Sequence, residues 1–499
     1  MALDLDRLRR DAEAFLRDAA EEEYENLAGK RTESRLAEVY ARHARLAEHD
    51  VVAEVASRRD TAGGPLAEFL VGLYAGRAAA AVADRLLAAE AAATLDLPGE
   101  PLTYRNAAVA IRNEADRSRR EAIARTKAAV DARLVPIRAE LWARTYEALA
   151  EVGHADYVAM CAGFSGIDYP SLASRLAAFT RETDDVYRDH LAYYLKKSVG
   201  PTPGGPASHD LARLLRAPQL DALFPKGDLL PVAEKTAAGL GLTLGAGGRI
   251  TVDDEARPGK TPRAFCMPIE VPNRIVLVVM PQGGQDDWRA FLHELGHALH
   301  FAHAAPDLPV EARYLGDNSV TEGFAFLVEH LMHAKPWLRR HLGLGRDQLD
   351  DYLRFAHFER LYIVRRYGAK LAYELDLHAD GGAASAPGGE RARRLADRYR
   401  EALHRAVGVD YPVESYLADV DPGFYSARYL RAWMFEAQLR DTLEERFDED
   451  WFRNPRAGTF LTGLWAEGQP ARLEALAERV GTGALDLAPL ARRIGRALA

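Results

Sequence analysis

Five consecutive residues, His293-Glu294-Leu295-Gly296-His297, have the types and the spacing of the metal-hydrolysis motif H-E-x-x-H. Residues four apart lie on one face of a helix, about one turn from each other. Both imidazoles can therefore bind one Zn²⁺ ion, at nitrogen–metal distances of about 2.0–2.1 Å. Glu294 follows the first histidine and can take a proton from a water molecule beside the metal. The expected chemistry is metal-assisted hydrolysis, with Glu294 as the general base.

The residues that flank this motif favour a metal site over a polar helix face. Trp288 to Leu292 precede the motif and Ala298-Leu299 follow it, so the helix that carries it is largely apolar. Such a face would bury two histidines and a glutamate. Unpaired buried polar groups are costly, and a bound metal ion removes that cost.

Three residues compete to be the third protein ligand that a catalytic zinc ion needs. His303 has the spacing of the last histidine in H-E-x-x-H-x-x-G-x-x-H, but His300 occupies the glycine position of that pattern. On an unbroken helix, His303 turns away from the face of His293 and His297. Asp317 lies in a Gly-Asp-Asn-Ser segment, which favours a helix cap. Glu322 opens a helical run and is the favoured ligand.

Two further residues lie near this expected site. Glu329 is two helical turns after Glu322 and is expected to accept a hydrogen bond from a ligand histidine. His300 shares the stripe of His293 and His297 but lies about 10 Å along the axis from His293. It is too far away to bind the same metal, so we expect it to support a ligand or to face the substrate.

These residues resemble a known group of enzymes. F-L-H-E-L-G-H-A-L-H, followed by a helix with E-x6-E, is similar to the gluzincin metallopeptidases and most closely to the thimet-oligopeptidase family. The angiotensin-converting-enzyme and all-helical metallocarboxypeptidase families are related. The resemblance implies that His293, His297 and Glu322 bind one zinc ion and that Glu294 is the base. The chain departs from the oligopeptidase pattern after Glu322, where Gly-Phe-Ala-Phe replaces Pro-Ser-Gln, and it lacks the carboxypeptidase signatures H-P-F and D-x-R-x-T.

A second segment, Asp421 to Trp433, is similar to the tyrosine-rich helix start of these families. The resemblance implies that Tyr429, or else Tyr425, donates a hydrogen bond to the developing oxyanion. A phenol hydroxyl is chemically suited to that task. Arg428 is a candidate to bind a substrate carboxylate, and a structural ion pair is the alternative. The histidine that the families place upstream of the tyrosine is absent.

The elements that must position these residues are mostly helices. Ala, Leu, Arg and Glu dominate the chain, and apolar residues recur at helical spacing in stretches such as 107–134 and 172–195. Pro- and Gly-rich segments at 198–210, 239–260 and 377–391 predict loops. The strongest strand signal, 264–270 and 274–280 around Val-Pro-Asn, predicts a hairpin beside the motif helix.

Composition excludes several classes of protein. The chain has 499 residues, 48% hydrophobic and 28% charged, which is enough to bury a large core. A net charge of -9 argues against binding to nucleic acid or to an anionic membrane. Two cysteines exclude a disulfide framework and a four-cysteine zinc site. No signal peptide is recognised, and the most apolar stretch, 70–97, contains charges, so we expect a cytoplasmic protein.

The sequence as a whole predicts a mostly α, two-lobed helical metallopeptidase with a deep cleft and a small β element beside the H-E-x-x-H helix. The expected division is a helical lobe, 1–210, and a catalytic lobe, 211–499. The expected function is hydrolysis of short unfolded peptides by a zinc enzyme. The alternatives are a zinc carboxypeptidase or dipeptidase of the same clan, and a non-catalytic zinc-stabilised binding protein.

Overall fold

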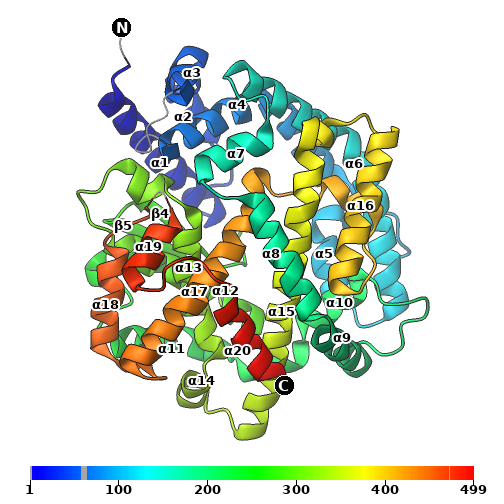
Figure 1. Ribbon diagram of the computed structural model, residues 1–499, viewed down its shortest axis with the longest axis vertical. Coiled ribbons are helices and arrows are strands. Elements are labelled where there is room, and N and C mark those ends of the chain that lie inside the picture. Colours follow the sequence, from blue (N-terminus) through cyan, green and yellow to red (C-terminus); the bar gives the residue numbers. More distant parts are fainter. Residues whose placement is uncertain (1–2, 58–63, 100, 471) are drawn as a thin grey trace. The chain divides into compact units, whose positions relative to one another are not determined.

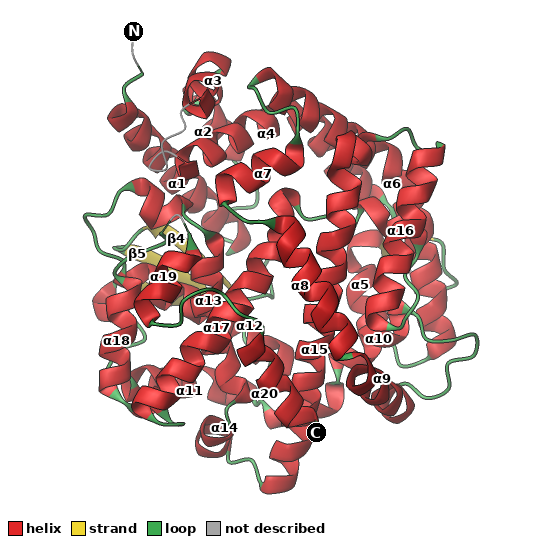
Figure 2. Cartoon of the chain, viewed as in Figure 1, coloured by secondary structure: helices red, strands yellow, loops and turns green. Residues whose placement is uncertain are grey.

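The structure is mostly helical, with two small sheets (Figures 1 and 2). It is a computed structural model that describes residues 3–57, 64–99, 101–470 and 472–499. The prediction of a mostly α chain is confirmed, because the abundant Ala, Leu, Arg and Glu have low helix cost and the apolar residues share helix faces.

The chain divides into two compact units, each built from separate segments. Unit 1 contains residues 1–70, 218–356 and 431–497, and unit 2 contains 71–217, 357–430 and the last two residues. The expected contiguous lobes, 1–210 and 211–499, differ from these units. The reason is that the division falls inside the long helices α4 (Gly64–Ala92), α15 (Arg346–His378) and α17 (Tyr425–Phe447), whose apolar periodicity continues without a linker.

Unit 1 contains a three-stranded sheet and the helices around it. Besides parts of α4, α15 and α17, its elements are α1 (Leu5–Leu27), α2 (Leu36–Arg42), η1 (Ala44–Ala47), α3 (His49–Ser57), η2 (Pro218–Leu223), η3 (Lys226–Asp228), α11 (Leu229–Gly239), η4 (Ala246–Gly248), β3 (Ile250–Asp253), β4 (Phe265–Glu270), β5 (Arg274–Val278), α12 (Gln285–His303), η5 (Glu311–Leu315), α13 (Asn318–Glu329), η6 (His330–His333), α14 (Lys335–Leu342), η10 (Trp451–Arg453), α18 (Pro455–Trp465), α19 (Leu473–Val480) and α20 (Ala488–Leu498).

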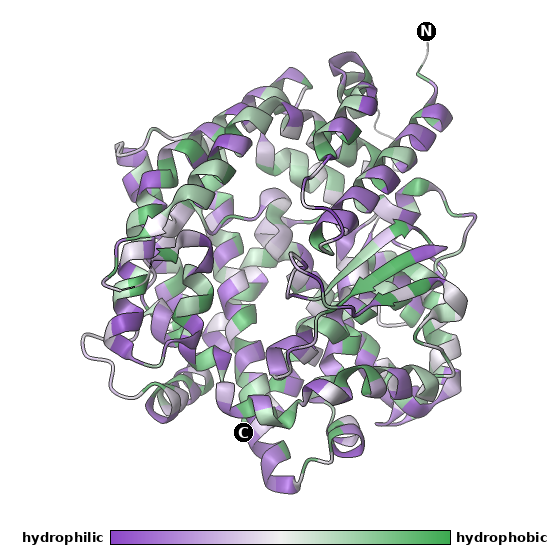
Figure 3. Cartoon of the chain, turned by 180° about the vertical axis from the view of Figure 1, so that it is seen from behind, coloured by the Kyte–Doolittle hydropathy of each residue, from purple (hydrophilic) through white to green (hydrophobic). Residues whose placement is uncertain are grey.

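The sheet of unit 1 has the strand order β3-β5-β4. The expected hairpin is confirmed, since β4 and β5 pair antiparallel with Cys266 opposite Leu277. The strand β3 was not expected from the Gly-rich sequence around it, and it pairs parallel to β5. In Figure 3 most of the length of the strands is green, the colour of hydrophobic residues, with purple where polar residues occur.

Both faces of the sheet are covered by helices. On one face, Val276 and Val278 of β5 join a core with Met267 of β4 and Tyr24 of α1. Successive strand residues point to opposite faces, so the neighbouring side chains of β5 point to the other face. The motif helix α12 contacts both β4 and β5. The hairpin thus fixes the position of α12.

Unit 2 is a helical assembly with one short two-stranded ladder. Besides parts of α4, α15 and α17, its elements are β1 (Thr94–Leu95), β2 (Leu102–Thr103), α5 (Tyr104–Asn113), α6 (Arg117–Glu151), α7 (Tyr157–Ser165), α8 (Tyr169–Glu182), α9 (Asp184–Ser198), α10 (Ser208–Arg216), η7 (Ala379–Ala384), α16 (Glu390–Val407), η8 (Val413–Leu417) and η9 (Pro422–Phe424). The two helical stretches expected at 107–134 and 172–195 are each interrupted, at 114–116 and at Thr183. Asp116 accepts from Arg119 N and so caps the start of α6.

By length and composition alone, one helix among the described residues, α4, is apolar enough to cross a membrane. In its most apolar window 39% of the residues are buried. Core helices pass the same test, so this is weak support for a membrane span.

A group of charged side chains, of which Lys370 and Glu374 are buried, lies in unit 2 between α15 and the segment before α17. We call Arg366, Lys370, Glu374, Asp419 and Asp421 the Lys370 cluster. The ammonium of Lys370 lies 2.8 Å from Asp421 and 3.4 Å from Asp419, and Arg366 lies 2.6 Å from Asp419. Glu374 accepts a hydrogen bond from the backbone N–H of Asp421 at 2.7 Å. The cluster therefore ties residues 419–421 to α15.

Candidate metal centre

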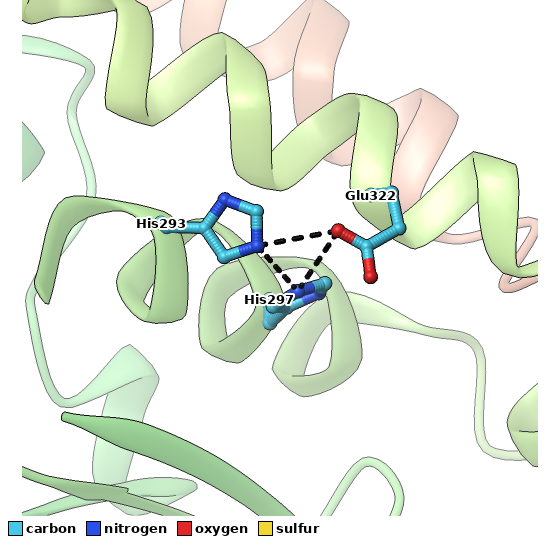
Figure 4. A group of neighbouring side chains, drawn as sticks. All are labelled: His293, His297 and Glu322. Carbon is cyan, nitrogen blue, oxygen red and sulfur yellow. Dashed lines mark hydrogen bonds and ion pairs between the residues drawn. The ribbon is translucent and has the colours of Figure 1, made fainter. Parts of the chain in front are cut away.

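Two histidines and one glutamate converge at the contact between α12 and α13 (Figure 4). Nε2 of His293 lies 3.2 Å from Nε2 of His297 and 3.2 Å from Oε2 of Glu322. Nε2 of His297 lies 3.7 Å from the same oxygen. Of the three candidates for the third ligand, the structure brings Glu322 to the two histidines.

Each imidazole is oriented by an oxygen on its other ring nitrogen. Oε2 of Glu329 lies 2.9 Å from Nδ1 of His293, and Oγ1 of Thr321 lies 2.8 Å from Nδ1 of His297. An ionised carboxylate only accepts hydrogen bonds, so Nδ1 of His293 carries the proton and donates it. The contact expected between Glu329 and a site histidine is confirmed. Both Nε2 atoms are thereby directed toward Glu322.

The two histidines titrate in opposite directions. Burial disfavours the charged form of His293, but hydrogen bonds to Glu322 and Glu329 outweigh it and raise its pKa to about 10. Burial lowers the pKa of His297 to about 4, with Glu322 opposing that effect. At neutral pH without a metal, His293 is therefore an imidazolium between two carboxylates, and His297 is neutral.

The three ligand atoms have the separations that a tetrahedral ion requires. Bonds of about 2.0–2.2 Å to a tetrahedral Zn²⁺ place its ligand atoms about 3.3–3.5 Å apart. The observed edges of 3.2, 3.2 and 3.7 Å surround that range. Two imidazole nitrogens and one carboxylate oxygen are also ligands that zinc prefers. The residues present thus fit a zinc ion with three protein ligands and an open fourth position.

Glu294 points toward the edge strand β4. Its Oε2 accepts a hydrogen bond from the backbone N–H of Cys266 at 2.9 Å. Burial raises the pKa of Glu294, while His293 and the Cys266 N–H oppose that rise. The second oxygen of the carboxylate, Oε1, is left for another partner. A carboxylate with a raised pKa and one oxygen held in place is suited to accept a proton near neutral pH.

Two glycines allow the helices to approach closely enough to form this site. A Cβ atom on Gly296, in the middle of the motif, would lie 2.5 Å from Cα of Ala325 in α13. A Cβ on Gly323 would lie 2.7 Å from the ring of Phe435 in α17. Both distances are too short for any side chain. The second contact gives a physical reason for Gly323 following Glu322 in this chain.

The other two ligand candidates have structural roles. Nδ1 of His303 contacts the carbonyl of Leu299 in its own helix at 2.8 Å. Asp317 caps α13 by accepting from the backbone N–H of Ser319, and it pairs with the buried Arg431 at 2.6 Å. The expectation of a cap at Asp317 is confirmed.

His300 does not lie at the site. Its side chain is fully buried, its Nε2 lies 3.1 Å from the carbonyl oxygen of Gly468, and its ring packs against Phe324. Burial lowers its pKa to about 3. Contrary to expectation, it neither faces a substrate nor contacts a ligand histidine through a hydrogen bond in this structure. It holds the segment after α18 against α12.

Unit 2 contains the other three candidate residues, Tyr425, Arg428 and Tyr429. The rings of Tyr425 and Tyr429 meet edge to face with centroids 5.0 Å apart, and Tyr429 also contacts Tyr367. Arg428 is buried. Tyr425 and Tyr429 thus form an aromatic stripe at helical spacing on α17.

Three residues of the site were missed by sequence reasoning. Thr321 orients His297, Cys266 holds Glu294 through its backbone, and Phe326 packs its ring 4.9 Å from that of His293. Thr321 precedes the ligand glutamate on the same helix, so helical geometry would have been a usable signal. Nothing in the residue type marks Cys266, because its backbone makes the contact.

No family model matches the chain, and no curated protein matches it.

Proposed function

We propose that this chain is a zinc-dependent peptidase that hydrolyses peptide bonds in short unfolded peptides. The observation that carries the proposal is the convergence of His293, His297 and Glu322 beside a half-buried carboxylate, Glu294, that is not part of the triangle. A purely structural metal has no use for a base at that position, and structural zinc sites favour cysteine ligands.

The chain's own residues supply the proton transfers of this reaction. When bound, zinc polarises the scissile carbonyl and lowers the pKa of a water molecule. Oε1 of Glu294 takes a proton from that water as its oxygen bonds to the carbonyl carbon. The carboxyl group then gives the proton to the departing amine nitrogen as the carbon–nitrogen bond breaks. The Cys266 N–H keeps Oε2 in place through both transfers.

The family resemblance extends the proposal to unit 2. Tyr429, with Tyr425 as the second choice, donates a hydrogen bond to the oxyanion. Arg428 binds a carboxylate of the substrate. A two-lobed molecule with a deep cleft would admit short unfolded chains. These roles rest on the resemblance of the segment from Asp421 to Trp433.

The edge of the sheet offers a place for the substrate backbone. β4 pairs with β5 on one side only, and its Cys266 N–H points to Glu294. An extended peptide added along β4 would lie beside the metal centre and would be recognised through its main chain. This arrangement favours peptides over other hydrolysable substrates.

Mass spectrometry of a mixed peptide pool tests the proposal. Each peptide is supplied with a free and with an amidated C-terminus, and the zinc-loaded chain is compared with Glu294→Gln. The variant keeps the size of the side chain and all three ligands, so its zinc content, measured by elemental analysis, should equal that of the wild type. Internal cuts in both peptide sets, absent with the variant, are expected.

Other outcomes separate the alternatives. Cuts confined to free C-termini would assign the chain as a carboxypeptidase, and release of dipeptide units would assign it as a dipeptidase. If both proteins hold one zinc ion per chain and neither cleaves any peptide, the peptidase proposal is wrong and the binding-protein alternative stands.

A further inference from the structure

A cavity of about 490 Å³ lies within unit 2, away from the residues of the metal centre in the sequence and in a different unit. Its walls come from α8, α9, α15 and α16, which are labelled in Figure 1. The volume falls in the range of about 300–1,000 Å³ that small-molecule sites occupy. The proposed peptidase reaction makes no use of this cavity.

One end of the cavity is lined by methyl groups. Ala173 and Ala177 are one turn apart on α8, and Ala369 and Ala372 face them from α15. The two helices meet closely at Gly368, where an added Cβ would lie 3.0 Å from Cβ of Leu176. Close packing at this crossing, with only small side chains beside it, leaves this end of the cavity apolar and open to solvent, since Ala177 and Ala372 are exposed.

The other end of the cavity is rich in arginine. Arg181, Arg188 and Arg405 line it together with a single acid, Asp184. That acid already has two cations, since the fully buried Arg365 lies 2.5 Å from it and Arg188 lies 3.3 Å from it. Positive charge therefore exceeds negative charge here, although the chain as a whole carries a net charge of -9.

The side chains of two of these arginines have no polar partner among the described residues. Within the described part of the chain, the guanidinium groups of Arg181 and Arg405 make no hydrogen bond or ion pair. Arg188, by contrast, donates to the carbonyl oxygen of Arg405 at 3.1 Å and so joins α9 to α16. Two guanidinium groups on different helices are thus free to bind one anion, for which the guanidinium fork is well shaped.

The polar and apolar ends are separated along α8. Ala173 precedes Arg181 by eight residues, about 12 Å along a helix. A ligand that satisfies both ends must carry an anionic head and an extended apolar body of comparable length. An inorganic anion would leave the alanines uncovered, and an uncharged hydrocarbon would leave the arginines without a partner.

We propose that this cavity binds a medium-chain carboxylate, with its head between Arg181 and Arg405 and its chain over Ala173, Ala177, Ala369 and Ala372. Carboxylate is favoured because both oxygens can accept from guanidinium groups. The site is independent of the metal centre and of the proposed peptidase function.

Isothermal titration of the full-length chain with decanoate tests this proposal. Decanol controls for the apolar body without the charge, and acetate and inorganic phosphate control for the charge without the body. Decanoate, kept below its micelle concentration, should bind once per chain and at least tenfold more tightly than any control. The variants Arg181→Gln and Arg405→Gln should each weaken decanoate about tenfold, since a hydrogen bond to a charged group contributes about 1.5–3 kcal/mol.

Matched variants keep the test decisive. Arg394→Gln removes an exposed arginine from α16 that does not line the cavity and should leave the affinity unchanged. Ala369→Leu should block the cavity. Circular dichroism and the melting temperature of this variant show whether it folds. Equal binding of decanol and decanoate, tighter binding of phosphate, or unchanged affinity in both arginine variants would each overturn the proposal.

Discussion

The candidate metal centre of unit 1 and the Lys370 cluster of unit 2 are both close groups of charged side chains, but they differ in charge balance. In the Lys370 cluster, two cations face two aspartates, and burial raises the pKa of Glu374 to about 8, so it is protonated at neutral pH. The cluster is neutral by itself. In unit 1, Glu322 and Glu329 both lie against the His293 imidazolium, at 3.2 and 2.9 Å.

The difference teaches how to separate a structural ion-pair network from a metal site. The Lys370 cluster alternates donors and acceptors: Asp419 lies against both Arg366 and Lys370, Asp421 lies against Lys370, and Glu374 accepts from the Asp421 N–H. The triad directs two lone pairs and one anionic oxygen at a common point. With both imidazoles neutral, a divalent cation balances Glu322 and Glu329, and no rearrangement of the chain is needed.

The largest expected effect comes from removing one ligand. His297→Ala should lose the zinc and lower peptidase activity about a thousandfold or more, because a metal ion supplies several kcal/mol of transition-state stabilisation. Zinc content and turnover of the same preparation are the measurements. Lys370→Met is the matched control in the other cluster and should keep one zinc per chain. Retention of zinc by His297→Ala would contradict the assignment of the triad.

Lys370→Met should in turn destabilise the fold by about 3 kcal/mol. Removing one partner of a buried ion pair leaves an uncompensated charge, which costs about 3–5 kcal/mol. The lower end applies because Asp419 and Asp421 are partly exposed, with side-chain exposures of 22% and 33%. Urea unfolding of the metal-free chain measures this change in the free energy of unfolding. A stability equal to that of the wild type would show that the cluster contributes no net ion pairing.

Glu329→Gln should weaken zinc binding about 10–100-fold, because partners that orient a ligand histidine typically contribute that much. The amide oxygen can still accept from Nδ1 of His293, but it carries no charge. Competition with a coloured chelator measures the affinity. Thr321→Val, which removes the hydroxyl at Nδ1 of His297, should have a smaller effect. An unchanged affinity in Glu329→Gln would mean that position and not charge is what this residue supplies.

Zinc binding should also depend on pH, with the smallest change for each pH unit. Zinc must displace the proton from Nε2 of His293, whose pKa is raised to about 10, whereas His297 is already neutral above about pH 4. Between pH 7 and pH 9 the apparent affinity should therefore rise about tenfold per pH unit, with about one proton released per zinc. Titration calorimetry in two buffers of different ionisation enthalpy counts that proton. In Lys370→Met the number of protons released per zinc ion should be unchanged.

Without the metal, the same group makes stability depend on pH. His293 has a folded-state pKa raised above its unfolded value of about 6.5. Its contribution to stability is fully present below that value and is lost as pH rises through about 10. Bound zinc should remove this dependence.

Local patterns predicted the motif helix, the hairpin, the position of Glu322 beside the two histidines, the acceptor Glu329 and the cap Asp317, because each depends on helix or strand periodicity over a few residues. The strand β3 pairs in parallel with a strand some twenty residues later, and parallel pairing leaves no turn signature. His300 shows a second limit. Its helical angle matches that of the ligand histidines, but the segment around Gly468 covers that turn of α12.

At Gly296 the structure restricts the residue type more than the motif does. H-E-x-x-H allows any residue there, yet a single methyl group would meet the backbone of α13 at 2.5 Å. A descendant of this chain with alanine at that position would keep both histidines, the base and Glu322, and would pass any search for the motif. The clash with α13 would nevertheless move Glu322 away from His293 and His297. The proposed activity could thus be lost through a residue that takes no part in the chemistry, and sequence surveys would count such a chain as intact.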